Sequence, residues 1–236
     1  MIATLVVALA ACGTGTDAEI DPGDDGEYEV VLDPASFVAV VDNPLSPLVP
    51  GSTWVYESVG GEEVERIEVV VLDETRMVMG IPATVVRDTV TVDGEVVEDT
   101  YDWFAQDDAG NVWYLGEDTK EYEDGVAVSS AGSWEAGVDG ALPGIVMESS
   151  PQVGDAYRQE FYPGEAEDLA EVVRVGTAET VGFGSYDDLT VIKEWNPLAP
   201  DVVEEKYYAE GVGLILEVAV RGGDDRIELV SFQPGG

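Results

Sequence analysis

Residues 83–105 of the chain read A-T-V-V-R-D-T-V-T-V-D-G-E-V-V-E-D-T-Y-D-W-F-A. Residues 83–92 and 95–105 are rich in β-branched and aromatic side chains, which favour strands. Asp93-Gly94 stands between them, and Asp-Gly between two such segments is among the strongest local indications of a two-residue hairpin turn. The stretch therefore predicts an antiparallel hairpin.

Segments of the same kind lie on both sides of this hairpin, separated by Gly, Pro, Asp and Asn. Helical periodicity is weak and confined to residues 165–173. Many short strands joined by tight turns indicate an antiparallel meander. We therefore predict an all-β fold, as a curved sheet or a sandwich, with further strands at residues 53–59, 66–72, 77–79, 112–115, 156–162, 171–175, 177–183, 189–195, 202–209, 213–220 and 226–232.

The chain also repeats itself in order. Residues 51–57 parallel residues 154–160, residues 86–88 parallel residues 192–194, and residues 96–101 parallel residues 202–207. The pattern predicts one β domain, residues 44–236, built from two related halves at about 51–117 and 154–232. Residues 118–153 would join the halves as an irregular segment. Chance similarity in a chain rich in Val and Glu is the alternative.

The N-terminus carries a different pattern. Residues 2–11 form an apolar run that is shorter than the roughly 20 residues of a membrane-spanning helix and has the length of a signal-peptide core. Leu9-Ala10-Ala11-Cys12 resembles a bacterial lipobox, which ends in a small residue directly before the Cys. The resemblance implies that residues 1–11 are a signal peptide and that Cys12 is lipidated. An ordinary apolar segment with a buried Cys is the alternative.

The run lacks the basic residues that normally begin a signal peptide, because no Lys or Arg precedes Arg66. We therefore expect that the chain starts downstream of the true start or is a fragment. Residues 12–43 contain many Gly, Thr and acidic residues, a composition typical of a flexible, self-repelling linker. We predict that they form an acidic tether between the lipidated Cys12 and the β domain.

The composition excludes several classes of function. The 236 residues contain 50 Asp and Glu against 10 Lys and Arg, a formal net charge of −40, which repels nucleic acids and favours cations or basic partners. Solubility or a salty habitat is the simpler explanation of the charge. Without His and with one Cys, the chain cannot supply a His-based triad, a His-ligated metal or a disulfide. We predict that the protein is not an enzyme.

Three segments carry a resemblance to known proteins. Residues 207–215 read Y-Y-A-E-G-V-G-L-I, residues 103–107 read W-F-A-Q-D, and residues 110–117 read G-N-V-W-Y-L-G-E. Together they resemble a family of uncharacterised exported bacterial lipoproteins over most of residues 44–229. The layout is similar, more distantly, to lipoprotein carriers of the Lol type, in which a curved sheet holds acyl chains. The resemblance implies export and brings no established activity.

Adjacent aromatic residues suggest a ligand groove. Successive side chains of a strand point to opposite faces, so one member of each pair must face away from the other. The second face could then bind an apolar or carbohydrate ligand. Burial in an ordinary core is the alternative. The predicted ligand-binding residues are Trp103, Trp113, Tyr114, Tyr207 and Tyr208.

Asp107, Asp108 and Asn111 form a candidate calcium site, because calcium prefers carboxylate and amide oxygens. Ordinary turn chemistry is the alternative, since Asp and Asn are common in turns. We expect no other cofactor.

The sequence thus predicts a non-enzymatic cell-envelope lipoprotein, exported and anchored in the membrane through Cys12, at the periplasmic side or the cell surface. Its ligand would be a small apolar or amphipathic molecule. The alternative is a structural or interaction module that binds another envelope protein, with calcium as a stabiliser. The third hypothesis is a carboxylate-based hydrolase, which needs a cleft with two facing carboxyl groups.

Overall fold

A computed structural model describes residues 28–60 and 64–236 of the chain. The predicted hairpin of residues 83–105 forms as β3 (Ile81–Val92) and β4 (Glu95–Gln106), which pair antiparallel. Asp93 and Gly94 have φ angles of 51° and 87°, and a type I′ turn needs positive φ at both central residues. The local sequence therefore determines this turn.

The described residues confirm the predicted all-β antiparallel fold, as one curved sheet and not as a sandwich of two. A short 3₁₀ helix, η1 (Pro34–Ser36), is the one helical element among them. No helix in this part of the chain is long and apolar enough to cross a membrane. The other strands are β1 (Thr53–Ser58), β2 (Glu65–Val78), β5 (Val112–Glu123), β6 (Val126–Ser129), β7 (Trp134–Glu135), β8 (Leu142–Met147), β9 (Ala156–Arg158), β10 (Glu160–Phe161), β11 (Leu169–Val181), β12 (Gly184–Trp195), β13 (Val203–Ala209), β14 (Gly213–Arg221) and β15 (Arg226–Gln233).

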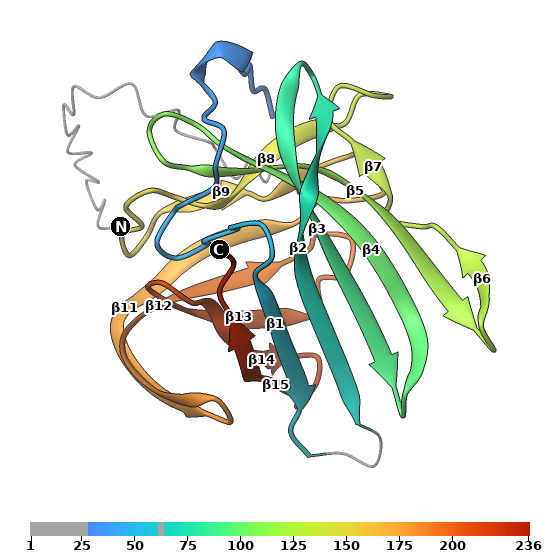
Figure 1. Ribbon diagram of the computed structural model, residues 1–236, viewed down its shortest axis with the longest axis vertical. Helices are drawn as coiled ribbons and strands as arrows, with labels where there is room; N and C mark the ends of the chain where they lie inside the picture. Colours follow the sequence, from blue (N-terminus) through green and yellow to red (C-terminus); the bar gives the residue numbers. More distant parts are fainter. Residues whose placement is uncertain (1–27, 61–63) are drawn as a thin grey trace, which may run out of the picture.

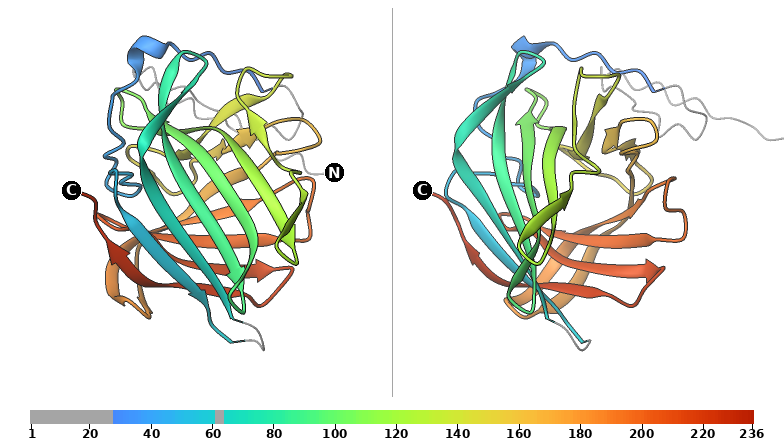
Figure 2. Two further views of the ribbon diagram at one scale, coloured as in Figure 1. Left: turned by 45° about the vertical axis from the view of Figure 1, so that its right-hand side comes forward. Right: turned by 90° about the vertical axis from the view of Figure 1, so that its right-hand side faces the viewer.

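The two ends of the sheet come together. The strand order is β10-β8-β5-β4-β3-β2-β1-β15-β14-β13-β12-β11-β9, with β6 and β7 paired to β5. The terminal strands β9 and β10 are consecutive in the chain and separated by Gln159 alone, so the sheet edges meet at this residue. Figures 1 and 2 show the result: β2–β5 form one wall, in green, and β11–β14 form a facing wall, in orange and red.

The two predicted halves occupy comparable places in the sheet. Strands β1 to β5 are neighbours in sequence order, and β9, β11, β12, β13 and β14 follow one another in the same way. The repeated segments 86–88 and 192–194 lie on β3 and β12, the third strand of each series. An ancestral duplication would produce this arrangement, and it stays a prediction.

The expected tether does not extend to residue 43. Tyr28 and Val41 are 6% and 2% exposed, and Phe37 forms a β-bridge with Asp107. Apolar side chains at 28–41 thus attach this segment to the sheet, and the acidic composition that suggested a linker belongs to the residues before it. The predicted signal peptide, residues 1–11, and the predicted lipidation site, Cys12, lie outside the described residues.

Residues 118–153 are also more regular than expected. They hold the end of β5 and the whole of β6, β7 and β8. Trp134 on β7 and Ile145 and Met147 on β8 are buried and anchor these two strands in the core, whereas β6 is exposed. The frequent Gly and Ser of this segment mark turns between strands and not an irregular loop.

Apolar residues occupy both faces of the sheet, because side chains alternate along each strand. Val85 and Trp103 are buried on one face with Leu115. Val86 and Trp54 belong to a second buried cluster, and both line a cavity. Buried apolar side chains therefore lie on both faces of the curved sheet.

Candidate functional site

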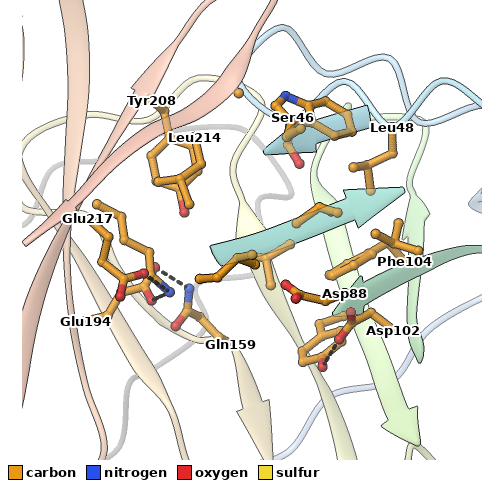
Figure 3. Close-up of a pocket in the computed structure, with 18 of the residues that line it drawn as sticks. Ser46, Leu48, Asp88, Asp102, Phe104, Gln159, Glu194, Tyr208, Leu214 and Glu217 are labelled. Carbon is orange, nitrogen blue, oxygen red and sulfur yellow. Dashed lines mark hydrogen bonds and ion pairs between the residues drawn. The ribbon is translucent and has the colours of Figure 1, made fainter. Parts of the chain in front are cut away.

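A cavity of about 440 Å³ lies between the two walls of the sheet (Figure 3). Strands from both halves line it, as does the loop that precedes β1. Apolar and aromatic side chains cover much of its surface, among them Leu48, Trp54, Ile67, Val69, Phe104 and Leu214.

Acidic side chains supply the polar part of the lining. Figure 3 shows Glu194 and Glu217 on one wall and Asp88 and Asp102 on the other. Lys206 is the one basic residue among the described residues of the lining. The seven acidic residues at the cavity are Asp88, Asp102, Glu117, Glu160, Asp168, Glu194 and Glu217.

Lys206 forms ion pairs with two carboxylates on its own wall of the cavity. Its Nζ lies 2.7 Å from Oε2 of Glu194 and 3.5 Å from Oε2 of Glu217. Burial alone would lower the pKa of Lys206, but the two carboxylates raise it well above its usual range. Gln159 Nε2 donates to the second oxygen of Glu194 at 2.9 Å. The single cation of the cavity is therefore already neutralised.

Tyr114 links two carboxyl groups on the opposite wall. Its hydroxyl lies 2.6 Å from Oδ1 of Asp102 and 3.0 Å from Oε2 of Glu117. Burial raises the pKa of Asp102 to about 7. Burial and the charge of Asp102 raise the pKa of Glu117 to about 8. Since one hydroxyl proton cannot serve two carboxylates, these groups hold an additional proton near neutral pH.

Asp88 lies on β3 and faces the same space. Burial, followed by the charges of Asp102 and Glu98, raises its pKa to about 8. Its Oδ1 atom is buried and has no hydrogen-bond partner among the described residues. A buried oxygen that lacks a donor costs free energy, which makes Asp88 the least satisfied group of the cavity.

Glu160 lies at the closure of the sheet. Its Oε2 accepts a hydrogen bond of 2.7 Å from Nε1 of Trp134, whose ring packs edge-on against Tyr114. Burial and the neighbouring carboxyl of Asp168 raise the pKa of Glu160 to about 10. Burial therefore favours the neutral form of Glu160.

The predicted aromatic residues divide between the two faces. Tyr114 and Tyr208 line the cavity, whereas Trp103, Trp113 and Tyr207 are not part of its lining. Trp103 is buried beneath the guanidinium of Arg76, Trp113 donates to Asp107, and the Tyr207 hydroxyl bonds to Arg174 and Glu205. Phe104 takes the place in the cavity predicted for Trp103.

The sequence did not single out Asp88, Asp102, Glu117, Glu194 or Lys206 as site residues. Asp88 and Glu194 close the two repeated segments 86–88 and 192–194, at positions that alternate with Val86 and Ile192. An acidic side chain on the same face of a strand as an apolar one is the pattern that could have indicated Asp88 and Glu194 as site residues.

The candidate calcium residues form a closed turn. Asp107 Oδ1 accepts from the backbone N–H of Asn111 at 2.9 Å, and Oδ2 accepts from Nδ2 of Asn111 and Nε1 of Trp113. Asp108 is exposed. Among the described residues no group of three or more acidic, His or Cys side chains is arranged to hold a metal ion. The geometry accounts for these residues through turn chemistry.

Replacing Asp107 by alanine is expected to lower the free energy of unfolding by about 1–2 kcal/mol, because Trp113 and Asn111 lose a charged acceptor. Urea denaturation measures the change, and it should be equal with millimolar calcium and with chelator. Asp108→Ala is the control, since that side chain is exposed. If chelator weakens the wild type to the level of Asp107→Ala, the carboxylate serves calcium instead.

Comparisons with known proteins return distant matches. No protein-family model matches the chain, and no curated protein matches it significantly. A Bacteroides fragilis protein described as exported and of YmcC-like fold is 13% identical, with a TM-score of 0.43 over 78% of this chain and 96% of that chain. A Parabacteroides distasonis protein described as a lipoprotein is 12% identical, with a TM-score of 0.40 over 81% of this chain and 99% of that chain.

Proposed function

We propose that the protein is a non-enzymatic, exported lipoprotein that binds a small amphipathic molecule in the cavity between the two walls. The cavity is the observation that carries the proposal. Its volume of about 440 Å³ falls within the range of about 300–1,000 Å³ typical of ligand sites.

The lining supports an amphipathic ligand over a purely apolar one. In the view of Figure 3, Leu48 and Leu214 lie toward one end of the cavity, while Asp88, Asp102 and Glu194 lie toward the other. A ligand with an apolar body and a polar group would match both parts. A purely apolar ligand would leave the acidic end without partners, which costs free energy when it displaces water.

The N-terminal sequence supports the location. The lipobox-like Leu9-Ala10-Ala11-Cys12 would place a lipid on Cys12, which anchors the domain outside the cytoplasmic membrane. A protein held at a membrane surface meets amphipathic molecules at high local concentration.

Native mass spectrometry of the full chain, produced with export, tests the proposal. We expect an additional mass that disappears on denaturation. Val69→Trp should abolish it, because Val69 lines the cavity, whereas Val70→Trp should keep it, because the next side chain on β2 faces away. A bare wild-type mass that persists after incubation with decanol would contradict the proposal.

A carboxylate-based hydrolase is the second candidate, favoured by the carboxyl groups whose pKa is raised into the range of a general acid, about 7 for Asp102 and about 8 for Glu117. The same experiment separates the two functions. A binding protein returns its ligand with unchanged mass, whereas a hydrolase would yield two products whose masses add up to that of the substrate plus one water.

A further inference from the structure

The charge of the cavity restricts the ligand beyond its amphipathic character. The lining contains seven acidic residues and a single base, and that base is paired with Glu194 and Glu217. An anionic head group would therefore find no free cation in the described lining. A positively charged group would be attracted by those carboxyl groups that are ionised, and its binding would favour their ionised form.

Asp88 offers the one atom that requires a donor. Asp88 lines the cavity, and its Oδ1 is buried and has no hydrogen-bond partner among the described residues. Figure 3 shows the carboxyl group of Asp88 directed into the space between the walls. When Asp88 is ionised its carboxylate accepts hydrogen bonds, so the missing partner of that form is a group with N–H or O–H protons.

The groups around Asp88 favour a cation over a neutral donor. Asp102 and Glu98 on β4 and Glu217 on β14 act against ionisation of Asp88, and Lys206 on β13 acts in its favour. Burial is the largest cause and the acidic groups add to it, so the pKa of Asp88 is raised to about 8 and its ionised form would be stabilised by a counter-charge. An ammonium group at Oδ1 would supply both the hydrogen bond and the charge.

Resting on the proposed function, we propose that the cavity selects amphipathic molecules that bear a protonated amine, and that the ammonium group binds the carboxyl of Asp88 while the apolar body lies toward Leu48 and Leu214. The amine must keep at least one N–H, since a quaternary ammonium cannot donate to Oδ1. Asp88 is thus the residue that would determine specificity.

Four probes with the same ten-carbon chain test this inference: decylamine, decanol, decanoate and decyltrimethylammonium. They are titrated calorimetrically into the full chain with Cys12→Ser, at about 0.15 M salt, where charges are screened over about 8 Å. We expect decylamine to bind at one site, about tenfold or more tighter than the other three, as a charged hydrogen bond implies.

Asp88→Asn keeps the shape of the side chain and should reduce the affinity for decylamine by about tenfold while leaving decanol unchanged. Asp187→Asn, which removes one charge from an exposed position on β12, should change neither. The four wild-type titrations stand as a test by themselves if Asp88→Asn fails to fold.

The outcomes separate this inference from the proposed function. If decanol or decanoate binds as tightly as decylamine, the cavity binds amphipathic molecules and the preference for amines is wrong. Equal losses in Asp88→Asn and Asp187→Asn would show attraction to the overall acidic surface, which also overturns the inference. If none of the four probes binds, the proposed function fails with it.

Discussion

Replacing Gly144 by alanine is expected to destabilise the protein by about 3 kcal/mol, near the upper end for an overpacked core position. Gly144 lies on β8, and a Cβ atom there would fall on the backbone of Arg158 and Gln159, well inside van der Waals contact. Neither neighbour can move as a side chain would. The clash lies where the two edges of the sheet meet, so relief requires β9 and β10 to shift away from β8.

Thermal unfolding measures this effect, and a loss of about 3 kcal/mol corresponds to a fall in Tm of about 10 °C for a chain of this size. Gly184→Ala is the matched control, because Gly184 also lies in a strand but its Cβ would meet the Tyr186 ring at 3.7 Å, an ordinary contact. Similar Tm values for both variants would show that β8 does not pack against the backbone of Gln159 and that the sheet edges are further apart.

The local parts of the fold could be predicted from the sequence, and the closure could not. Asp93-Gly94 specifies its hairpin through two adjacent residues, so no distant contact is needed. The pairing of β1 with β15, which joins Thr53 to Gln233, depends on residues at opposite ends of the domain. The meeting of β9 and β10 at Gln159 depends on the total curvature of the sheet, which short patterns do not encode.

The candidate site was predictable only in part for a related reason. Alternation requires Tyr114 and Tyr208 to face away from Trp113 and Tyr207, and the structure confirms that the two members of each pair lie on opposite faces. Which member faces inward depends on the register of the whole sheet and on bulges such as the one between Asp102 and Phe104 in the pairing of β4 with β5.

The acidic residues of the cavity could not be recognised from the sequence, because acidic residues are frequent throughout the chain. With 50 Asp and Glu in the chain, Asp88 and Glu117 do not stand out as residues. They differ from the others in their surroundings, because the walls that face them remove water and bring like charges together. This property arises from tertiary structure and has a measurable consequence for the pH dependence of stability.

Folding stability is expected to fall as the pH rises from about 4 to about 8, opposite to the behaviour of proteins whose carboxylates are salt-bridged. The pKa values of Asp88, Asp102 and Glu117 are raised from 3.8, 3.8 and 4.5 to about 8, 7 and 8. Below pH 4 these groups are protonated in both states and have no effect. Between pH 4 and 8 the unfolded chain releases their protons while the folded protein retains them, so the unfolded state is stabilised relative to the folded one. Above pH 8 the loss is complete.

Each pKa unit corresponds to about 1.4 kcal/mol, and the three groups share protons and contact solvent in the cavity, so we expect a loss on the order of 5 kcal/mol in all, or about 15 °C in Tm. Thermal unfolding between pH 4 and 9 measures this loss.

The double variant Asp102→Asn, Glu117→Gln should flatten the pH profile of stability and be more stable than wild type at pH 8. The exposed pair Asp187→Asn, Glu210→Gln removes the same charge and should leave the profile unchanged. If surface repulsion alone caused the pH dependence, the two double variants would have the same profile. The pH dependence would also vanish in about 1 M salt, where the screening length is about 3 Å. Either result would contradict a cavity that holds its carboxyl groups in the neutral form.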